Sequence, residues 1–219
     1  PIISFLNKES LKLDEIILTH HHDDHIAGCN ELINIWEARL TAPLFDKDKI
    51  PFANRYVSDN DIIDVIGLTS KIISSPGHTL GHICYYFQDD NILFSGDTLF
   101  RLGCGRVFEG TMDQMKDSLK KIRNLPDDTL VFCGHEYTLS NAKFCLSFYK
   151  EDEEFKKLFD EIEDLVNINK PTIPFLLGQE KRFNPFLQFD NKKFKEFLNI
   201  DNFNESEVFE HIRLKKDSF

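Results

Sequence analysis

Short apolar runs recur along the first part of the chain, and each is closed by a Gly, a Pro or a polar residue. Their length, their β-branched and aromatic content and the turn residues after them predict buried strands. The four clearest runs are residues 13–18, 71–77, 91–96 and 129–134. Before the first run, residues 1–11 are expected to form a short helix.

Helical periodicity marks the other elements. Apolar residues recur at helical spacing over residues 113–125, with Thr111 and Gln114 as a capping box before them and Pro126 after them. Beyond about Tyr137 we expect helices and no strands. These helices span residue 140 or 141 to 149, residues 155–166, and residues 205–215 with Asn204 and Glu207 as their cap.

This change of pattern divides the chain into two predicted domains. Residues 1–139 are expected to form an α/β domain that holds a metal centre, and residues 140–219 a small helical domain. No repeat or low-complexity segment stands out.

Every predicted strand leads into a His or an Asp, the residue types that bind catalytic metals. The first strand runs into a segment with four histidines, and the other three are followed by His78, Asp97 and His135. Ligands placed just beyond strand ends converge at one edge of a layered α/β fold. The candidate ligands are His20, His22, Asp24, His25, His78, Asp97 and His135.

Seven candidate ligands exceed the four of a structural zinc site and suit two ions that share a carboxylate. We therefore expect two divalent metal ions, zinc in the first place, although iron and manganese accept the same ligands. His21, His82 and Asp23 are expected outside the ligand set. In an extended segment His21 points away from its neighbours, and His82 is expected to make buried hydrogen bonds near the ligands.

Several motifs resemble a known superfamily. THHHDDH at 19–25, PGHTLGH at 76–82, GDTLF at 96–100 and CGHEY at 133–137 resemble the metallo-β-lactamase superfamily. GCGR at 103–106, FEGT at 108–111 and the tail RLKKDSF at 213–219 are similar to the glyoxalase II (hydroxyacylglutathione hydrolase) family. The resemblance runs from about Leu13 to the last residue.

The resemblance implies a fold and a set of site residues. The fold would be a metallo-β-lactamase-type αββα sandwich with a small C-terminal α-helical domain that binds glutathione. One metal would be bound by His20, His22 and His78, the other by Asp24, His25 and His135, with Asp97 bridging them. The implied glutathione contacts are Arg106, Tyr137, Arg213 and Lys216.

The implied reaction is metal-dependent hydrolysis of S-D-lactoylglutathione, or another S-2-hydroxyacylglutathione, to glutathione and a 2-hydroxy acid such as D-lactate. A metal-bound hydroxide, oriented by Asp24 or Asp97, would attack the thioester carbonyl. Arg213 and Lys216 would pair with the carboxylates of glutathione. Cations at the end of a helix also complement its dipole, and this structural interpretation stays open for each of them.

Other activities of the superfamily are the alternatives. A persulfide dioxygenase uses a single iron and normally lacks a helical tail, so residues 140–219 favour the thioesterase. A lactonase or a β-lactamase shares much of the metal loop. A metal-binding protein without turnover is the alternative from a different class, and turnover on a thioester would separate it from an enzyme.

Two departures from the family pattern are present. Only eighteen residues precede Thr19, so the family's opening strands have no counterpart here. We expect a truncated chain rather than their true absence, because a bare sheet edge would expose apolar surface. Position 108, where some relatives carry Tyr, is Phe, so a hydroxyl contact with the substrate would be lost.

Composition changes this interpretation little. Hydrophobic residues make up 41% and charged residues 29% of the 219, as in ordinary globular proteins, and no apolar stretch is long enough for a membrane span. The net charge of −11 argues against a nucleic-acid partner. Five cysteines without a CxxC pair predict reduced, mostly packed thiols, Cys104 among them. We expect a monomeric cytoplasmic enzyme whose partner is a small-molecule glutathione thioester.

Overall fold

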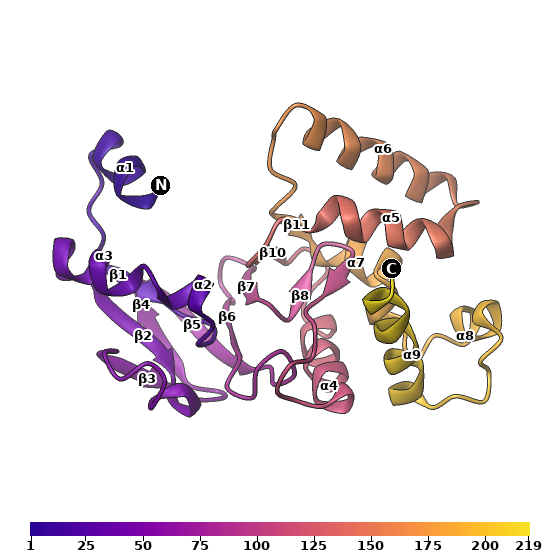
Figure 1. Ribbon diagram of the computed structural model, residues 1–219, viewed down its shortest axis with the longest axis horizontal. Helices are drawn as coiled ribbons and strands as arrows, with labels where there is room; N and C mark the ends of the chain where they lie inside the picture. Colours follow the sequence, from indigo (N-terminus) through magenta and orange to yellow (C-terminus); the bar gives the residue numbers. More distant parts are fainter.

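The computed structural model describes residues 1–219. The N-terminal strands lie toward one end of the molecule and the helices α5 to α9 lie together toward the other, while α1 projects from the body beside the N-terminus (Figure 1). None of the helices combines the length and the apolar character that crossing a membrane requires.

Two sheets and a hairpin form the α/β part. A three-stranded sheet has the order β1-β2-β3, a six-stranded sheet has the order β11-β10-β7-β6-β5-β4, and β8 pairs with β9. The strands are β1 (Glu15–Ile17), β2 (Arg39–Pro43), β3 (Arg55–Val57), β4 (Ile62–Val65), β5 (Leu68–Ser74), β6 (Ile83–Phe87), β7 (Ile92–Gly96), β8 (Leu99–Phe100), β9 (Gly103–Cys104), β10 (Leu130–Cys133) and β11 (Phe175–Leu176).

The helices fall into a few short ones among the strands and a larger group after β10. They are α1 (Ile2–Lys8), α2 (Asp23–Ile26), α3 (Cys29–Trp36), α4 (Met112–Arg123), α5 (Thr138–Tyr149), α6 (Glu153–Asn167), α7 (Leu177–Phe183), α8 (Lys192–Leu198) and α9 (Glu205–Asp217). Two 3₁₀ turns, η1 (Leu44–Asp46) and η2 (Pro185–Leu187), complete the list.

The four apolar runs predicted as strands are confirmed, as β1, β5, β7 and β10. β7 and β10 are parallel neighbours, with Leu93 opposite Val131, so their C-terminal ends lie at the same edge of the sheet. Asp97 and His135 follow these two ends and are therefore brought to one place.

Both predicted capping boxes are present. Thr111 Oγ1 accepts a hydrogen bond from the Gln114 N–H at 3.1 Å, and Asn204 Oδ1 accepts one from the Glu207 N–H at 3.1 Å. The helices α4, α5, α6 and α9 confirm the four long helices expected from periodicity, although α5 begins at Thr138, slightly earlier than predicted.

The expectation that no strand follows Tyr137 is wrong. β11 pairs antiparallel with β10, with Leu176 opposite Leu130 and Phe175 opposite Val131. The free edge of β10 offers backbone groups that an extended segment beside it can satisfy. A strand of two residues leaves no alternation in the sequence, and the seven-residue helices α7 and α8 are likewise too short for periodicity to reveal.

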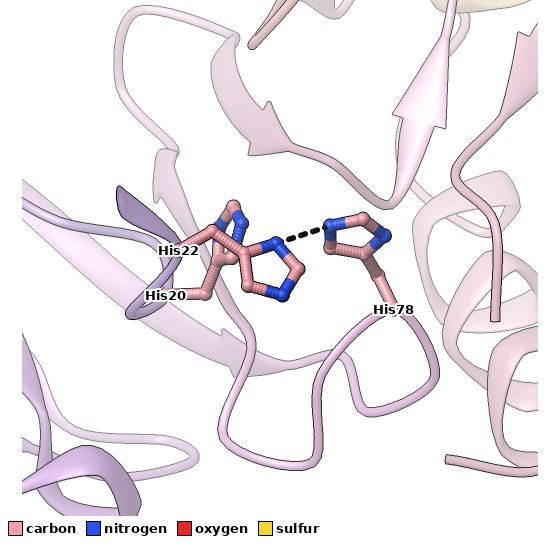
Figure 2. Close-up of side chains that lie close together, drawn as sticks. All are labelled: His20, His22 and His78. Atoms are coloured by element: carbon pink, nitrogen blue, oxygen red, sulfur yellow. Dashed lines mark hydrogen bonds between the residues drawn. The ribbon is translucent and has the colours of Figure 1, made fainter. Parts of the chain in front are cut away.

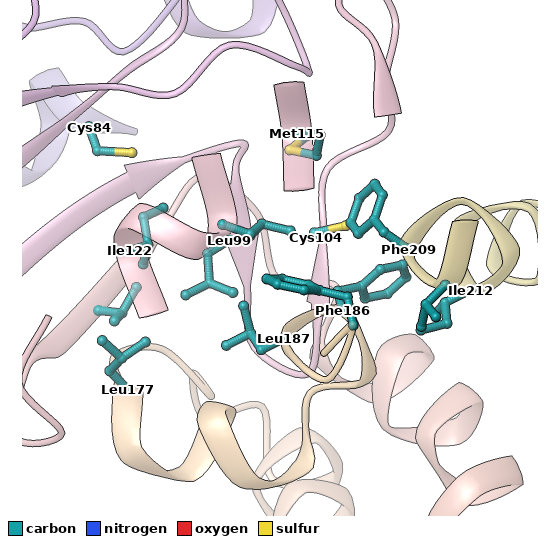
Figure 3. Packing of buried hydrophobic residues seen from close by; sticks show 14 of the residues in the cluster. Cys84, Leu99, Cys104, Met115, Ile122, Leu177, Phe186, Leu187, Phe209 and Ile212 are labelled. Carbon is teal, nitrogen blue, oxygen red and sulfur yellow. The ribbon is translucent and has the colours of Figure 1, made fainter. Parts of the chain in front are cut away.

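The main hydrophobic core joins the two parts of the chain. Its 22 buried residues include Leu99 and Met115 from the α/β part and Phe186 and Phe209 from the helical part (Figure 3). Full burial of one such side chain contributes about 1.5–3 kcal/mol. The helical part is therefore fixed against the α/β part, and it can supply a rigid wall to a site between them.

Glu180, on α7, is a fully buried carboxyl at the junction of the two parts. Its Oε2 accepts hydrogen bonds from the Leu102 N–H at 2.7 Å and from Asn184 Nδ2 at 2.8 Å, while Oε1 has no partner. Burial raises the pKa of Glu180 to about 7, because the hydrogen bonds and the charge of Arg101 offset only part of the desolvation.

We expect Glu180→Gln to gain stability relative to the wild type as the pH rises. Between the ordinary carboxyl pKa of 4.5 and about 7, the folded wild type keeps a proton that the unfolded chain has lost, so its stability falls with rising pH. The unfolding free energy of the variant minus that of the wild type should increase by up to about 3 kcal/mol between about pH 5 and pH 8, measured by urea denaturation. Exposed Glu161→Gln serves as the control, and parallel pH profiles for E180Q and the wild type would contradict the prediction.

Candidate metal centre and substrate pocket

The segment after β1 carries four potential ligands, two of them before α2 and two in its first turn. His20 and His22 lie between β1 and α2, and the backbone of His22 is extended where it caps α2. The first turn of α2 then carries Asp24 and His25. His78, in the loop after β5, completes a group with the first two histidines, and its Nε2 lies 3.0 Å from His22 Nδ1 (Figure 2).

The structure brings all seven predicted ligands together in three overlapping groups. In each group the nitrogen and oxygen atoms lie within 4.8 Å of one another, as they would around one cation. The groups are His20, His22 and His78; His20, His25 and Asp97; and Asp24, His25 and His135. Because members are shared, these groups form one continuous cluster, which is typical of a binuclear metal site.

Asp97 lies at the centre of this cluster. Its carboxylate oxygens are 3.5 Å from Nε2 of His78, 3.4 Å from Nε2 of His25 and 3.2 Å from Nε2 of His135. The side chain approaches β10 so closely that a Cβ at Gly134 would lie 2.3 Å from Asp97 Oδ1. A side chain at this position, just after β10, would displace the Asp97 carboxylate, so Gly134 leaves the carboxylate its place among the histidines.

The charge states of the cluster suit a divalent cation. Burial lowers the pKa of His20, and it lowers the pKa values of His22 and His78 as well. Burial also favours the neutral ring of His25, but the contact with Asp97 outweighs it and raises the pKa of His25. The pKa of Asp97 is lowered by the same contact and by the other histidines, against the effect of burial. Neutral His20, His22 and His78 beside an anionic Asp97 are the state that binds a metal, whereas His25, whose charged ring is favoured by Asp97, would release its proton on binding one.

Unpartnered buried atoms show that a metal pair fits these residues. His20 Nε2, His25 Nε2 and Asp97 Oδ1 are shielded from solvent and have no hydrogen-bond partner. Buried polar groups in folded proteins are normally satisfied, so three convergent exceptions call for a further group at this point. A cation would satisfy all three.

Hydrogen bonds behind the cluster hold its members in place. His78 Nδ1 lies 2.8 Å from the carbonyl oxygen of Arg106, and His82 Nε2 accepts a hydrogen bond from the Asp97 N–H at 3.0 Å. His82 is fully buried and lies outside the three groups; burial lowers its pKa to about 3. His21 and the exposed Asp23 also lie outside them.

The cluster lies at the base of a pocket of about 620 Å³. Five predicted ligands line it, together with all four residues expected to contact glutathione, which are Arg106, Tyr137, Arg213 and Lys216. The ring of Tyr137 stacks on His135 with their centroids 5.0 Å apart, and Phe108 meets His78 edge-on at 5.2 Å. The structure thus places the predicted metal and substrate residues in one cavity.

The three cations that line the pocket differ in exposure and in hydrogen bonding. The Arg213 side chain is only 4% exposed and donates to the carbonyl oxygen of Cys104 at 3.0 Å and to Asp217 Oδ1 at 2.9 Å. Lys216 Nζ donates to the carbonyl oxygen of Ser140 at 3.1 Å, and burial together with the charge of Arg213 lowers its pKa. The Arg106 side chain also pairs with Asp217, with its Nε 3.4 Å from Oδ1, but it is 62% exposed and is the most accessible of the three.

Sequence reasoning missed two of these wall residues. Asp217 stands four residues after Arg213 on α9, which is the spacing of a helical ion pair and could have indicated the contact. Ser140 gives no comparable signal, because its contact with Lys216 joins α5 to α9, which are distant in sequence.

Known proteins match both parts of the chain. A family profile described as "Metallo-beta-lactamase superfamily" matches residues 3–47 and 49–135, and one described as "Hydroxyacylglutathione hydrolase C-terminus" matches residues 136–219. The chain belongs to the hydroxyacylglutathione hydrolase family. It is 42% identical over 218 residues to the "Hydroxyacylglutathione hydrolase" of Rhodopseudomonas palustris (strain HaA2) and 44% identical over 221 residues to that of Bartonella quintana (strain Toulouse). Both alignments cover 100% of this chain and 86% of the relative.

Solved structures agree with the fold of this hydroxyacylglutathione hydrolase family member. ETHE1 from Myxococcus xanthus superposes with a TM-score of 0.66 at 24% identity, over 97% of this chain and 73% of that one. The BLEG-1 B3 metallo-β-lactamase superposes with a TM-score of 0.63 at 22% identity, over 85% of this chain and 82% of that one. These likenesses concern the fold alone, and they confirm the predicted metallo-β-lactamase architecture.

Asp97→Ala should lose one or both metals together with activity. Asp97 alone contacts ring nitrogens both in the group with His78 and in the group with His135. The loss of rate should exceed the 10- to about 100-fold typical for removal of a residue behind the ligands. Metal content per chain and thioester turnover would be measured on the same preparation. Asp23→Ala, an exposed carboxylate beside the cluster, is the matched control. Two retained ions and a normal rate in D97A would refute a central role for Asp97.

Proposed function

We propose that this chain hydrolyses S-D-lactoylglutathione, or another S-2-hydroxyacylglutathione, to glutathione and a 2-hydroxy acid such as D-lactate. The observation that carries the proposal is the shared pocket, in which the metal cluster forms the base and cations from the loop after β9 and from α9 stand on the wall. The family of the chain supports the same substrate class. The five free thiols support action in a reducing compartment such as the cytoplasm.

The metal ligands follow from the three groups. We assign His20, His22 and His78 to one ion and Asp24, His25 and His135 to the other, with Asp97 shared, and we propose zinc, although iron or manganese would accept the same ligands. When bound, such a pair lowers the pKa of coordinated water from about 16 towards about 7, so that hydroxide is available at neutral pH.

The side chains of the pocket then place the reactants. Arg106, the exposed cation, faces a carboxylate of the substrate most readily, and Lys216 stands beside it on the same wall. Arg213, held by Cys104 and Asp217, shapes the wall and contributes its charge. Tyr137, stacked on His135, supplies a flat surface beside the ligands for the part of the substrate that reaches them.

The reaction needs an oriented water and a good leaving group. The carboxylate of Asp24 is 57% exposed in the pocket, where it can accept a hydrogen bond from the attacking water and direct its oxygen at the thioester carbonyl carbon. The carbon–sulfur bond then breaks. A thiol with a pKa of about 8.5 leaves as a thiolate without a dedicated acid, and the proton given up by the water passes to this thiolate or to solvent.

Hydrolysis of S-D-lactoylglutathione by the purified protein of known metal content tests the proposed reaction. Loss of thioester absorbance should be rapid, should stop after treatment with a chelator and should return with added zinc. A protein that holds two ions and leaves this thioester intact would contradict the proposal and would direct attention to lactone and β-lactam substrates.

The double variant Arg106→Ala and Lys216→Ala should raise KM for the glutathione thioester by more than about tenfold, since each lost charged hydrogen bond costs about 1.5–3 kcal/mol before solvent screening. KM for a small neutral thioester should change little. Arg213 is left intact because it is buried, and Lys215→Ala, which removes a cation of the same helix that does not line the pocket, is the control. Equal effects on both substrates would show that these cations do not bind the glutathione part of the substrate.

A further inference from the structure

His21, the histidine of residues 20–25 that stays outside the ligand groups, lies between two carboxylates. Its Nδ1 is 3.0 Å from Asp46 Oδ1 and its Nε2 is 3.1 Å from Glu109 Oε1. In either neutral tautomer one ring nitrogen carries a proton, so at least one of the two carboxylates accepts a hydrogen from the ring. The ring is therefore held from both sides, although it binds no metal.

Asp46, at the end of η1, is the unusual member of this arrangement. Its side chain is 0% exposed, and neither oxygen has a hydrogen-bond partner apart from this approach of His21. A buried carboxylate is costly unless it is paired, so its retention needs a reason other than packing. Asp46 also abuts the loop that carries His78, because a Cβ at Gly81 would lie 2.6 Å from Asp46 Oδ1.

Glu109, which contacts the other side of the His21 ring, belongs to a loop that lines the pocket. Its Oε2 accepts a hydrogen bond from the Leu80 N–H at 2.9 Å, and Lys49 Nζ donates to its Oε1 at 3.1 Å. The same loop carries Arg106, whose carbonyl oxygen lies 2.8 Å from His78 Nδ1. Four segments that are distant in sequence thus meet around His21: the metal loop, η1, the loop of residues 77–82 and the wall loop of residues 105–110.

We propose that Asp46 is a positioning residue, which holds the His21 ring and thereby aims the two flanking histidines, His20 and His22, at the metal pair. The ring of His21 meets Asp46 and Glu109, whereas the rings of its two neighbours meet His78. Because the three side chains alternate in this way, holding the middle ring fixes the path of the backbone from which the other two project. The inference rests on the ligand roles proposed above. It adds a contribution to metal affinity from a residue that touches neither a metal nor the substrate.

A purely structural role for Asp46 predicts a different behaviour, and Glu15 provides the comparison. Glu15, in β1, is also a buried carboxylate with a side chain 1% exposed. It accepts hydrogen bonds from Thr41 Oγ1 at 2.8 Å and Arg39 Nη2 at 3.0 Å and pairs with Arg55. None of these partners lies in a loop that carries a proposed ligand, so Glu15→Gln removes a buried charge without touching the His21 contacts.

The experiment compares Asp46→Asn and Glu15→Gln by competition for zinc with a chelator of known affinity, alongside thermal unfolding. E15Q should unfold at a lower temperature because it weakens the paired contacts of Glu15, whereas D46N alone should bind zinc 10- to about 100-fold more weakly. At saturating zinc D46N should still hold two ions, and its kcat should recover while KM stays at the wild-type value. Zinc affinity of D46N within about twofold of the wild type, or an equal loss in E15Q, would overturn the proposal.

Glu109→Gln covers the case in which D46N does not fold. Glu109 is partly exposed, and the variant loosens the other side of the ring without leaving a buried charge. A zinc affinity several times weaker than that of the wild type is expected, and an unchanged affinity would overturn the proposal. A wild-type protein that binds two zinc ions but hydrolyses no glutathione thioester would refute the proposed function separately, since these affinities are measured without substrate.

Discussion

The parallel pairing of β7 with β10 is the constraint on which the rest of the site depends. Parallel neighbours end at the same edge of a sheet, so the residues that follow them, Asp97 and His135, must lie together. Gly134 leaves room for the Asp97 carboxylate, which a Cβ at that position would displace. The histidines of the other segments then gather around a negative charge whose place is already set by backbone hydrogen bonds.

The pocket, in contrast, requires both parts of the chain. Its base comes from the loops of the α/β part, while Arg213 and Lys216 come from α9 and are fixed by contacts with Cys104 and Ser140. In a protein with a net charge of −11, the cations that line the pocket beside the metal cluster form a local region of positive charge, which favours the approach of an anionic molecule. The shared hydrophobic core keeps these cations at a constant distance from the metal cluster.

The sequence was informative wherever the signal is local. Strands that end in a ligand, such as the run before Asp97, and capping boxes, such as Thr111 with Gln114, involve neighbouring residues and could be predicted. The contacts of Asp46 could not, because η1 meets His21 only after folding, and nothing near Asp46 in the sequence marks it as buried. The hydrogen bonds that hold each cation could not be predicted either. The carbonyl oxygen that accepts from Arg213 belongs to Cys104, which lies 109 positions away.

The pairing of β11 with β10 limits how far the two parts of this protein can be treated as separate modules. The helical part contributes β11 to the six-stranded sheet, where it pairs with β10, the strand that leads to His135. A cut at residue 139 would bare the outer edge of β10 and invite pairing between molecules. Exchange of helical tails between relatives would likewise succeed only where the donor tail brings a matching edge strand. The hydrogen-bonding needs of β10 thus tie the helical part to the part that carries the metal cluster.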